Sequence, residues 1–280
     1  MKKNIDRIRN IILTVLAAII GLIFSFPLLW MIMQSFQSDS EAIYALPPVL
    51  PEKLDFSSYQ FILENWDILR LLGNTLTIVV CVCILTVIAS TLVGYGFARI
   101  EARGKNLMFS ILLGTVMLPF VVTLVPSYAI WARLGLLGTY VPLILPSIGG
   151  GAFNIFLVRM FIMGIPRSLD EAAEIDGCSR LQTLFRVIIP QLGPVLATIV
   201  LFTFIGVWGD YVSPSLYLWG HTDMYTLSIK LATSFKSEFG TMDWPKVMAG
   251  CVIVSVPIVA VILRFQNAFV RGVVTSGIKE

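Results

Sequence analysis

Charge is scarce in this sequence. Asp, Glu, Lys and Arg make up 13% of the 280 residues, whereas hydrophobic residues make up 57% and the mean hydropathy is +0.86. Soluble domains contain about 25% charged and about 45–50% apolar residues. The composition therefore excludes an ordinary soluble domain and indicates an integral membrane protein. The net charge of +3 gives no basic excess of the kind that nucleic acid attracts.

Residues and motifs that bind metals or nucleotides are also few. His221 is the only histidine, so neither a multi-histidine metal site nor a Ser-His-Asp triad with a spare histidine is available. Cys81, Cys83, Cys178 and Cys251 show no C-x-x-C or Cys…His spacing, and we interpret them as small apolar fillers. There is no G-x-x-x-x-G-K-[ST] phosphate loop, and Gly94-Tyr95-Gly96 lacks the third glycine of a dinucleotide motif. We therefore expect no catalytic residues, metal or cofactor in this chain.

Six apolar segments are long enough to cross a bilayer as helices. A hydrocarbon core of roughly 30 Å needs about 20 apolar residues, because unpaired backbone groups are costly in lipid. The predicted spans are about Asn10 to Met33, Asn74 to Ala98, Leu107 to Trp131, Tyr140 to Met163, Leu192 to Pro214 and Val247 to Phe265. The first is longer than the apolar core of a signal peptide and has no small-residue cleavage pattern. The sequence thus predicts an all-α integral membrane protein with six transmembrane helices.

Lysine and arginine are distributed unevenly between the two sides of these spans. Fourteen of the 20 lie on one side of the predicted spans: before span one, between spans two and three, at or between spans four and five, or after span six. The other 6 lie on the opposite side. Because basic residues are retained in the cytoplasm, both termini are predicted to be cytoplasmic. The longer loops, Gln34 to Gly73 and Ser215 to Lys246, are then external. The first, with "LPPVLPEKLDFSSYQFI", is either an ordered loop that meets a soluble partner or a solvated connector.

One cytoplasmic segment, Pro166 to Pro190, reads "PRSLDEAAEIDGCSRLQTLFRVIIP" and carries several acidic residues. Ser168 and Glu171 fit a capping box, in which the serine hydroxyl accepts from the backbone N–H of Glu171 and the glutamate reaches back. Ser179 and Gln182 fit a second capping box. The segment is therefore predicted to form two short helices along the membrane surface.

The turn and the exposed face of this segment point to a possible partner contact. Gly177, between the two helices, suits the left-handed conformation that ends a helix. Leu169, Ala172 and Ala173 share one face of the first helix, and paired alanines permit close approach by another protein. The alternative is a well-capped connector with no partner.

The same segment resembles the EAA loop of ABC importer permeases. That pattern is E-A-A, three residues, Gly, nine residues, Ile, any residue and Leu-Pro. Matching residues are Glu171, Ala172, Ala173, Gly177 and Pro190, while Val187 and Ile189 replace the usual Ile and Leu.

The resemblance covers nearly the whole chain and is closest to the carbohydrate-uptake permeases, the family that includes the maltose permease. "STLVGYGFARIEARGKN" resembles the family's span-two ending, and "FTFIGVWGDYVSP" resembles its span-five signature. "FQNAFVRGVVTSGIKE" resembles its C-terminal tail, although Asn267 stands where a basic residue is common.

The resemblance implies a type I ABC importer permease fold. Residues 1–73 would form an N-terminal span with an external loop, 74–265 the transmembrane domain with a coupling loop at 166–190, and 266–280 a cytoplasmic tail. The implied function is carriage of a sugar or oligosaccharide across a bacterial or archaeal cytoplasmic (inner) membrane. The implied partners are a second homologous permease, two cytoplasmic ATPases that bind ATP and Mg, an external solute-binding protein and membrane lipid.

By the same resemblance, the first helix of the loop, with Ser168 and Leu169, is the coupling helix that sits in a cleft of the ATPase. Glu171 would contact the ATPase, Ala172 and Ala173 would pack in the cleft, and Gly177 would provide the bend. ATP-driven closure of the ATPases would then move the spans as rigid bodies.

Residues of the substrate pathway are open to two interpretations. Asp210 is a charge in the membrane, costing about 2.5–3.5 kcal/mol unless it faces water or a partner. With Trp208 and Tyr211 it forms a candidate sugar-facing group, because aromatic rings stack on sugars and carboxylates accept from hydroxyls. Alternatively, Asp210 anchors a helix or loop at the outer mouth.

A second candidate lies in span four. The run Gly149-Gly150-Gly151, preceded by Pro142 and Pro146, can break this span so that Asn154 lines the cavity, or the glycines only allow close helix packing.

Two other functions compete with the sugar importer. An ABC permease for another solute, such as a polyamine or phosphate, would share the coupling loop. A secondary transporter would show internal repeats or twice the spans and a buried ion relay, which this sequence lacks.

Overall fold

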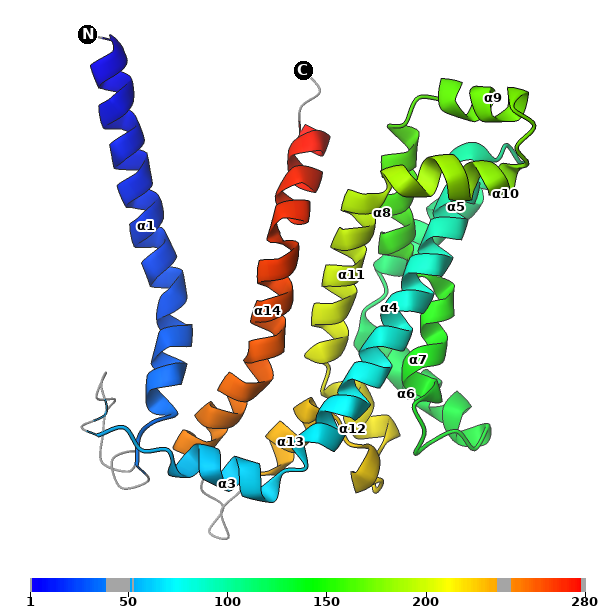
Figure 1. The fold of residues 1–280 in the computed structure, drawn as a ribbon. Coiled ribbons are helices and arrows are strands. Elements are labelled where there is room, and N and C mark those ends of the chain that lie inside the picture. The colour runs from blue at the N-terminus through cyan, green and yellow to red at the C-terminus, as the bar shows by residue number, and fades with distance from the viewer. Residues whose placement is uncertain (1, 39–50, 52, 236–242, 278–280) are drawn as a thin grey trace. The chain divides into compact units, whose positions relative to one another are not determined.

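The computed structural model describes residues 2–38, 51, 53–235 and 243–277. Within these residues every regular element is a helix (Figure 1). The chain divides into two compact units, residues 1–67 with 231–256 and residues 68–230 with 257–280, and each is described by itself.

The number of candidate membrane spans in the structure equals the six predicted from the sequence if each bent pair of helices is counted as one span. Four segments are long and apolar enough alone: Arg9–Gln34, Ile68–Arg99, Val141–Met163 and Trp244–Phe265. Two bent pairs raise the number to six among the described residues. The prediction of an all-helical chain with multiple apolar spans is confirmed.

The first unit contains α1 (Lys2–Gln34) and α3 (Ser57–Asn65), joined by the segment predicted as an external loop. Part of this segment is ordered, because Asp55 N–H donates to Phe36 O at 2.9 Å and the hydroxyls of Ser35 and Tyr59 lie 2.7 Å apart. The Asp55 carboxylate accepts from the backbone N–H of Ser57 at 2.8 Å, and this hydrogen bond lowers the pKa of Asp55. Residues 39–50 and 52 of the loop lie outside the described residues.

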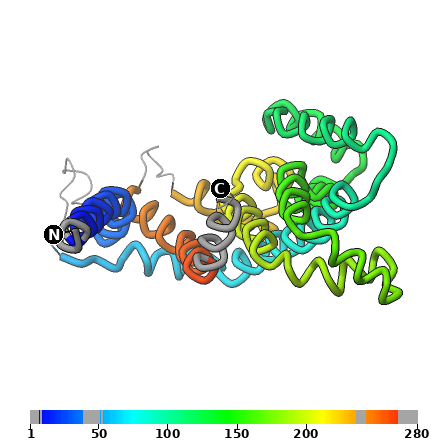
Figure 2. Tube along the Cα trace, turned by 90° about the horizontal axis from the view of Figure 1, so that it is seen from above, coloured from blue at the N-terminus to red at the C-terminus, as the bar shows by residue number. Residues whose placement is uncertain are grey.

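The second unit is built on α4 (Ile68–Arg99), α8 (Ala152–Met163) and α11 (Gly193–Trp208), which run side by side in Figures 1 and 2. Their shared core includes Tyr95, Val158, Ile188 and Ile199. Gly94 permits the close crossing of α4 and α8, since a Cβ there would lie 2.7 Å from Val158 Cγ1. α9 (Ser168–Ile175) and α10 (Arg180–Thr183) lie across one end of these three helices.

Predicted span three consists of two helices in the structure rather than one continuous helix. α5 (Lys105–Val116) and α6 (Phe120–Arg133) meet at 96°. Pro119 causes the break, because its ring fixes φ near −65° and removes a backbone donor, and its ψ of 135° is extended. Figure 2 shows this pair and the α9/α10 loop on opposite sides of the α4, α8 and α11 group.

Span four is interrupted at its glycines, as predicted, and one of these glycines also allows close helix packing, but the interruption does not place Asn154 among the residues that line the cavity. α7 (Val141–Ile144) and a 3₁₀ turn (Leu145–Gly149) precede α8, with Gly150 and Gly151 at φ values of +71° and +69°. Gly150 also allows close packing, because a Cβ there would lie 2.8 Å from the Ser90 nitrogen in α4.

Span five ends before its predicted boundary and begins in an unusual turn. α10 continues into a widened π-type turn, Leu184–Ile188, and a 3₁₀ turn, Ile189–Gln191, and the line of α11 then bends by 78°. α11 ends at Trp208 rather than Pro214, because the chain turns at Gly209 into α12 (Val212–Tyr217). η4 (Thr222–Met224) and α13 (Leu227–Thr233) follow.

The last helix, α14 (Trp244–Gly277), continues well beyond the predicted end of span six at Phe265.

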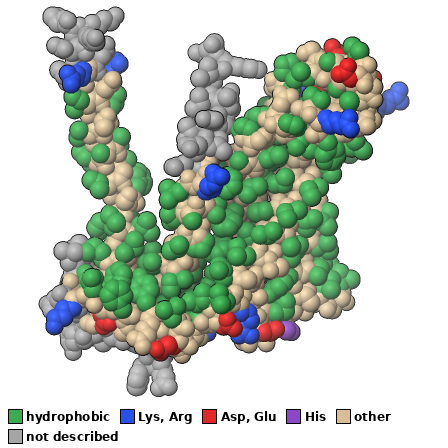
Figure 3. Space-filling model, viewed as in Figure 1, with side chains coloured by type: hydrophobic (Ala, Val, Ile, Leu, Met, Phe, Trp, Pro, Cys, Tyr) green, Lys and Arg blue, Asp and Glu red, His purple; other side chains and the backbone are tan. Residues whose placement is uncertain are grey.

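Hydrophobic side chains cover the length of the helices of the second unit, whereas acidic and basic side chains gather at their two ends (Figure 3). Val80, Ile84 and Ile88 of α4 are about half exposed, and Val121 and Val125 of α6 are 73% exposed. A soluble monomer does not present apolar faces of this extent. Such faces fit contact with lipid or with other membrane helices.

Candidate coupling loop and translocation cavity

Only one of the two predicted capping boxes forms. Ser179 and Gln182 make the complete box: the Ser179 N–H donates to Gln182 Oε1 at 2.7 Å, and the Gln182 N–H donates to Ser179 Oγ at 3.4 Å. The Ser168 box is wrong, because the helix starts one residue earlier. Arg167 is the cap, with helical φ and ψ of −65° and −23°, and its carbonyl already accepts from the Glu171 N–H at 3.1 Å.

Gly177 closes α9 as the sequence predicts. Its φ is +78°, its N–H donates to Glu174 O at 3.0 Å, and the next N–H, of Cys178, donates to Ala173 O at 2.9 Å. A Cβ on Gly177 would meet nothing within 4 Å. The position is therefore selective for glycine through its backbone conformation alone.

α9 presents its residues in two directions. Ser168, Glu171 and Ala172 are exposed, and Leu169 is 38% exposed. Ala173 is only 5% exposed and packs toward its own chain. The face predicted to hold both alanines is thus divided, with Ala172 outward and Ala173 inward.

The loop is attached to the end of α4 by two side chains one turn apart. Arg99 Nε lies 2.9 Å from Asp170 Oδ2, and Arg99 Nη2 donates to Ile165 O at 2.8 Å. The Tyr95 hydroxyl donates to Arg180 O at 3.2 Å, at the start of α10. The Arg99 side chain is 9% exposed and that of Asp170 is 23% exposed, so the ion pair is mostly buried.

A neighbouring arginine holds the core helices rather than the loop. Arg159 of α8 donates from Nε to Phe97 O at 3.3 Å, and its guanidinium carbon lies 4.1 Å from the centre of the Phe109 ring. It therefore links α8 to α4 and α5, partly through a cation–π contact.

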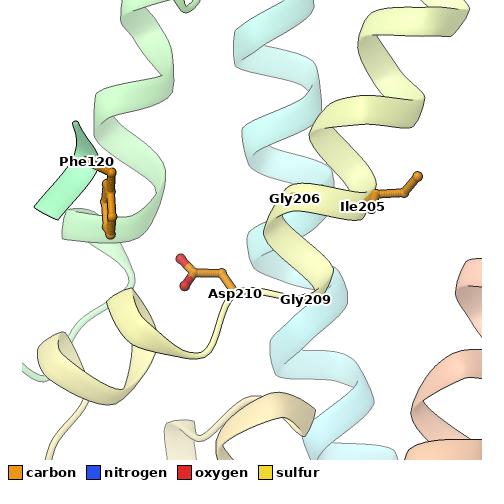
Figure 4. Close-up of a pocket in the computed structure, with 5 residues that line it drawn as sticks. All are labelled: Phe120, Ile205, Gly206, Gly209 and Asp210. Atoms are coloured by element: carbon orange, nitrogen blue, oxygen red, sulfur yellow. The ribbon is translucent and has the colours of Figure 1, made fainter. Parts of the chain in front are cut away.

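A cavity of about 440 Å³ lies beside the other end of α11. It is lined by Phe120, Ile205, Gly206, Gly209 and Asp210. In Figure 4 the Asp210 carboxylate extends toward Phe120 across this space, and the two glycines leave the α11 side bare of side chains. An aromatic ring, a carboxylate and exposed backbone together can bind a polar solute with apolar faces.

Asp210 also holds the chain that leaves α11. Its Oδ1 accepts from the Ser213 N–H at 3.1 Å, at the start of α12, and its carbonyl accepts from Ser228 Oγ at 2.6 Å. Tyr217 of α12 has a raised pKa, chiefly because it is buried and further because of the Asp210 charge. The geometry therefore supports an anchoring role for Asp210 alongside its place in the cavity.

The other three predicted pathway residues lie elsewhere. Trp208 is 1% exposed and stacks on Phe204 with ring centres 5.3 Å apart. Tyr211 is 43% exposed outside the cavity lining, and Asn154 donates to Gly150 O at 3.3 Å at the break in span four. The structure thus brings none of the three into the cavity with Asp210.

Several residues of both sites were missed from the sequence. Phe120 comes from the unpredicted bend in span three, so no local signal marked it. Tyr95 and Arg99 do carry a signal, since the spacing of four residues in "GYGFAR" places them on one helix face. Within the described residues, no cluster of three or more His, Cys, Asp or Glu side chains could hold a metal ion.

Comparison with known proteins agrees with this architecture. Residues 90–275 match the family described as the binding-protein-dependent transport system inner membrane component. The arabinooligosaccharides transport system permease protein AraQ of Halalkalibacterium halodurans is 30% identical over 282 residues, which cover 100% of both chains. The trehalose/maltose transport system permease protein MalG of Thermococcus litoralis is 29% identical, with 97% of this chain and 98% of that protein covered.

Among solved structures, a chain of a bacterial ABC transporter involved in the import of the acidic polysaccharide alginate has a TM-score of 0.79 and 25% identity. The match covers 94% of this chain and 97% of that chain, so the type I ABC permease fold is shared over almost the whole length. The chain therefore belongs to the family of binding-protein-dependent transport system inner membrane components, the multi-pass permeases of ABC importers.

Proposed function

We propose that this protein is the membrane-spanning permease subunit of an ABC importer that carries a sugar or oligosaccharide into the cytoplasm. The observation that carries the proposal is end-to-end similarity to permeases for arabinooligosaccharides and for trehalose and maltose. The cavity beside α11 supports it, because an exposed aromatic ring and a carboxylate are the groups that sugars contact.

The subunit is proposed to act in a larger assembly. A second homologous permease would cover its exposed apolar faces, an external binding protein would deliver the solute, and two cytoplasmic ATPases would hold ATP and Mg. The absence of a phosphate-loop motif from the sequence supports placing ATP hydrolysis in a partner. The chain itself is then a transport subunit without a catalytic site of its own.

α9 is proposed to be the element that meets the ATPase. Leu169, Glu171 and Ala172 face outward and would form the contact, with Ser168 at the start of the helix. Ala173 faces inward, so we assign it to the seating of α9 on its own subunit rather than to the ATPase cleft. Gly177 sets the angle between α9 and α10.

Asp210 is proposed to line the solute pathway. Its carboxylate would accept from a sugar hydroxyl while Phe120 packs on the sugar ring. Trp208 and Asn154 would support the ends of helices beside this pathway, and Tyr211 would flank its outer side.

The function is tested by uptake into proteoliposomes that contain the assembled complex and its binding protein. Radiolabelled arabino-oligosaccharides, maltose, trehalose and alginate oligosaccharides are offered in turn, with spermidine and phosphate as other solutes. We expect ATP-dependent uptake of at least one carbohydrate, and vesicles without internal ATP serve as the control. Uptake of spermidine or phosphate in place of every carbohydrate would assign the permease to another solute class.

Orientation follows from the charge distribution, and we propose that both termini and α9 are cytoplasmic. In cells that carry the chain with Cys81, Cys83 and Cys251 replaced by alanine, a membrane-impermeant thiol reagent should label Ser57→Cys but not Cys178. Ser57 is exposed at the start of α3. Cys178 should react only after the cells are permeabilised, and its labelling in intact cells would reverse the orientation.

A further inference from the structure

α4 has a loop attached at each of its ends by polar side chains. At one end, Tyr95 and Arg99 hold Arg180 and Asp170 of the coupling loop and Ile165 just before it. These two side chains are four residues apart, so one helix face holds the chain entering α9, α9 itself and the start of α10.

At the other end, α4 holds the segment around residues 223–227. Asn74 Nδ2 donates to Asp223 O at 2.8 Å and to Tyr225 O at 3.0 Å. Thr75 Oγ1 accepts from the Leu227 N–H at 3.0 Å and is buried.

This second loop is in turn attached to the cavity. Ser228, the residue after Leu227, donates its hydroxyl to Asp210 O at 2.6 Å. A chain of direct contacts therefore runs from α9 through Arg99, the length of α4, Asn74 and Thr75, and residues 223–228 to Asp210.

Two physical features suit this chain of contacts to transmit movement. α4 is a continuous helix of 32 residues, roughly 48 Å long at about 1.5 Å per residue, and packed helices move as rigid bodies. The Arg99–Asp170 pair is mostly buried, so breaking it leaves an uncompensated charge, and the contact resists separation.

We propose that Arg99 is a positioning residue through which displacement of α9 moves α4, and with it the loop of residues 223–228 that holds Asp210. This proposal rests on the proposed function, because an ATPase must displace α9. It goes beyond that function by naming the helix and the side chains that carry the displacement to the cavity.

The test measures hydrogen exchange in the complete complex, with and without ATP and vanadate. In the wild type, trapping the complex with ATP and vanadate should change deuterium uptake both in α9 and in residues 222–228. In Arg99→Gln, the change in residues 222–228 should fall at least threefold while the ATPases stay bound. The double variant Arg99→Gln with Asp170→Asn, which leaves no unpaired buried charge, should show the same loss and guards against misfolding.

Two further variants show which contacts transmit the displacement. Arg167→Gln is the matched control, because Arg167 pairs with Glu101 at 3.5 Å with side chains 62% and 81% exposed, and it should behave as the wild type. Asn74→Ala, which leaves the coupling loop untouched, should lose the change in residues 222–228 but keep that in α9.

A wild-type response of residues 222–228 in the two Arg99 variants would overturn the proposal, as would a wild-type response in Asn74→Ala or no response in the wild type with its ATPases bound. Failure of the wild-type chain to bind any ATPase would instead overturn the proposed function.

Discussion

Replacing Gly177 by valine is expected to lower sugar uptake and ATP hydrolysis together, by about tenfold or more. The φ of +78° at Gly177 is a conformation that a β-branched residue adopts only at a cost of about 1–3 kcal/mol. Open space surrounds the position, so no steric clash contributes. The strain is relieved by turning α9 relative to α10, which misdirects the face that meets the ATPase. Uptake, ATP hydrolysis and the amount of ATPase that copurifies are measured on the same preparation.

Gly104→Val is the matched control for this variant. Gly104 has φ of +79°, also has open space around it, and lies before α5 outside the coupling loop. Both variants therefore carry the same backbone strain, and only Gly177→Val should weaken ATPase binding. Normal transport and full ATPase content in Gly177→Val would show that the α9/α10 segment is a mere connector.

Asp210→Asn is expected to keep the yield of the complex and to raise the KM for sugar uptake by about tenfold to hundredfold. Asparagine retains an oxygen that can accept from the Ser213 N–H, so the start of α12 is preserved. It removes the negative charge that faces the cavity, and a hydrogen bond to a charged group contributes about 1.5–3 kcal/mol. The KM is measured in proteoliposomes with the sugar that the uptake screen identifies.

Asp210→Ala separates the two roles of this residue. Alanine removes both the charge and the acceptor, so yield should fall along with transport. If Asp210→Asn transports with an unchanged KM while Asp210→Ala loses yield, Asp210 is an anchor and the sugar contacts lie elsewhere. The comparison uses the yield of purified complex as the measure of anchoring.

The spans could be predicted from sequence wherever apolar length alone decides the structure. Residues 10–33 and 74–98 fall inside single helices of the structure, as expected for uninterrupted apolar runs. Pro119 was equally visible in the sequence but lies in an apolar run, and hydropathy does not report that a proline will turn the chain by 96°. The cavity residue Phe120 was missed for that reason.

Local patterns predicted turns better than they predicted contacts. Gly177 and the Ser179 capping box depend on neighbours within a few residues, and both were confirmed. The Ser168 box failed although it has the same pattern, because the carbonyl of Arg167 already accepts the hydrogen bond that the serine was expected to accept. The pairing of Arg99 with Asp170, 71 positions apart, is set by how α4 packs, which no local pattern encodes.

The π-type turn at Leu184–Ile188 lies between α10 and α11, and its length affects the direction in which the chain enters α11. Such a turn accommodates one residue more than an α-helix does, and one residue rotates everything that follows by about 100° around the helix axis. Loss of a single residue there would leave α9 and α11 intact but would shorten the spacing between Gly177 and Pro190. Because the chain bends by 78° between this turn and α11, the rotation would swing α11 in a new direction and move Gly206 and Gly209 relative to Phe120. The number of residues in this turn therefore sets how the two sides of the cavity face each other.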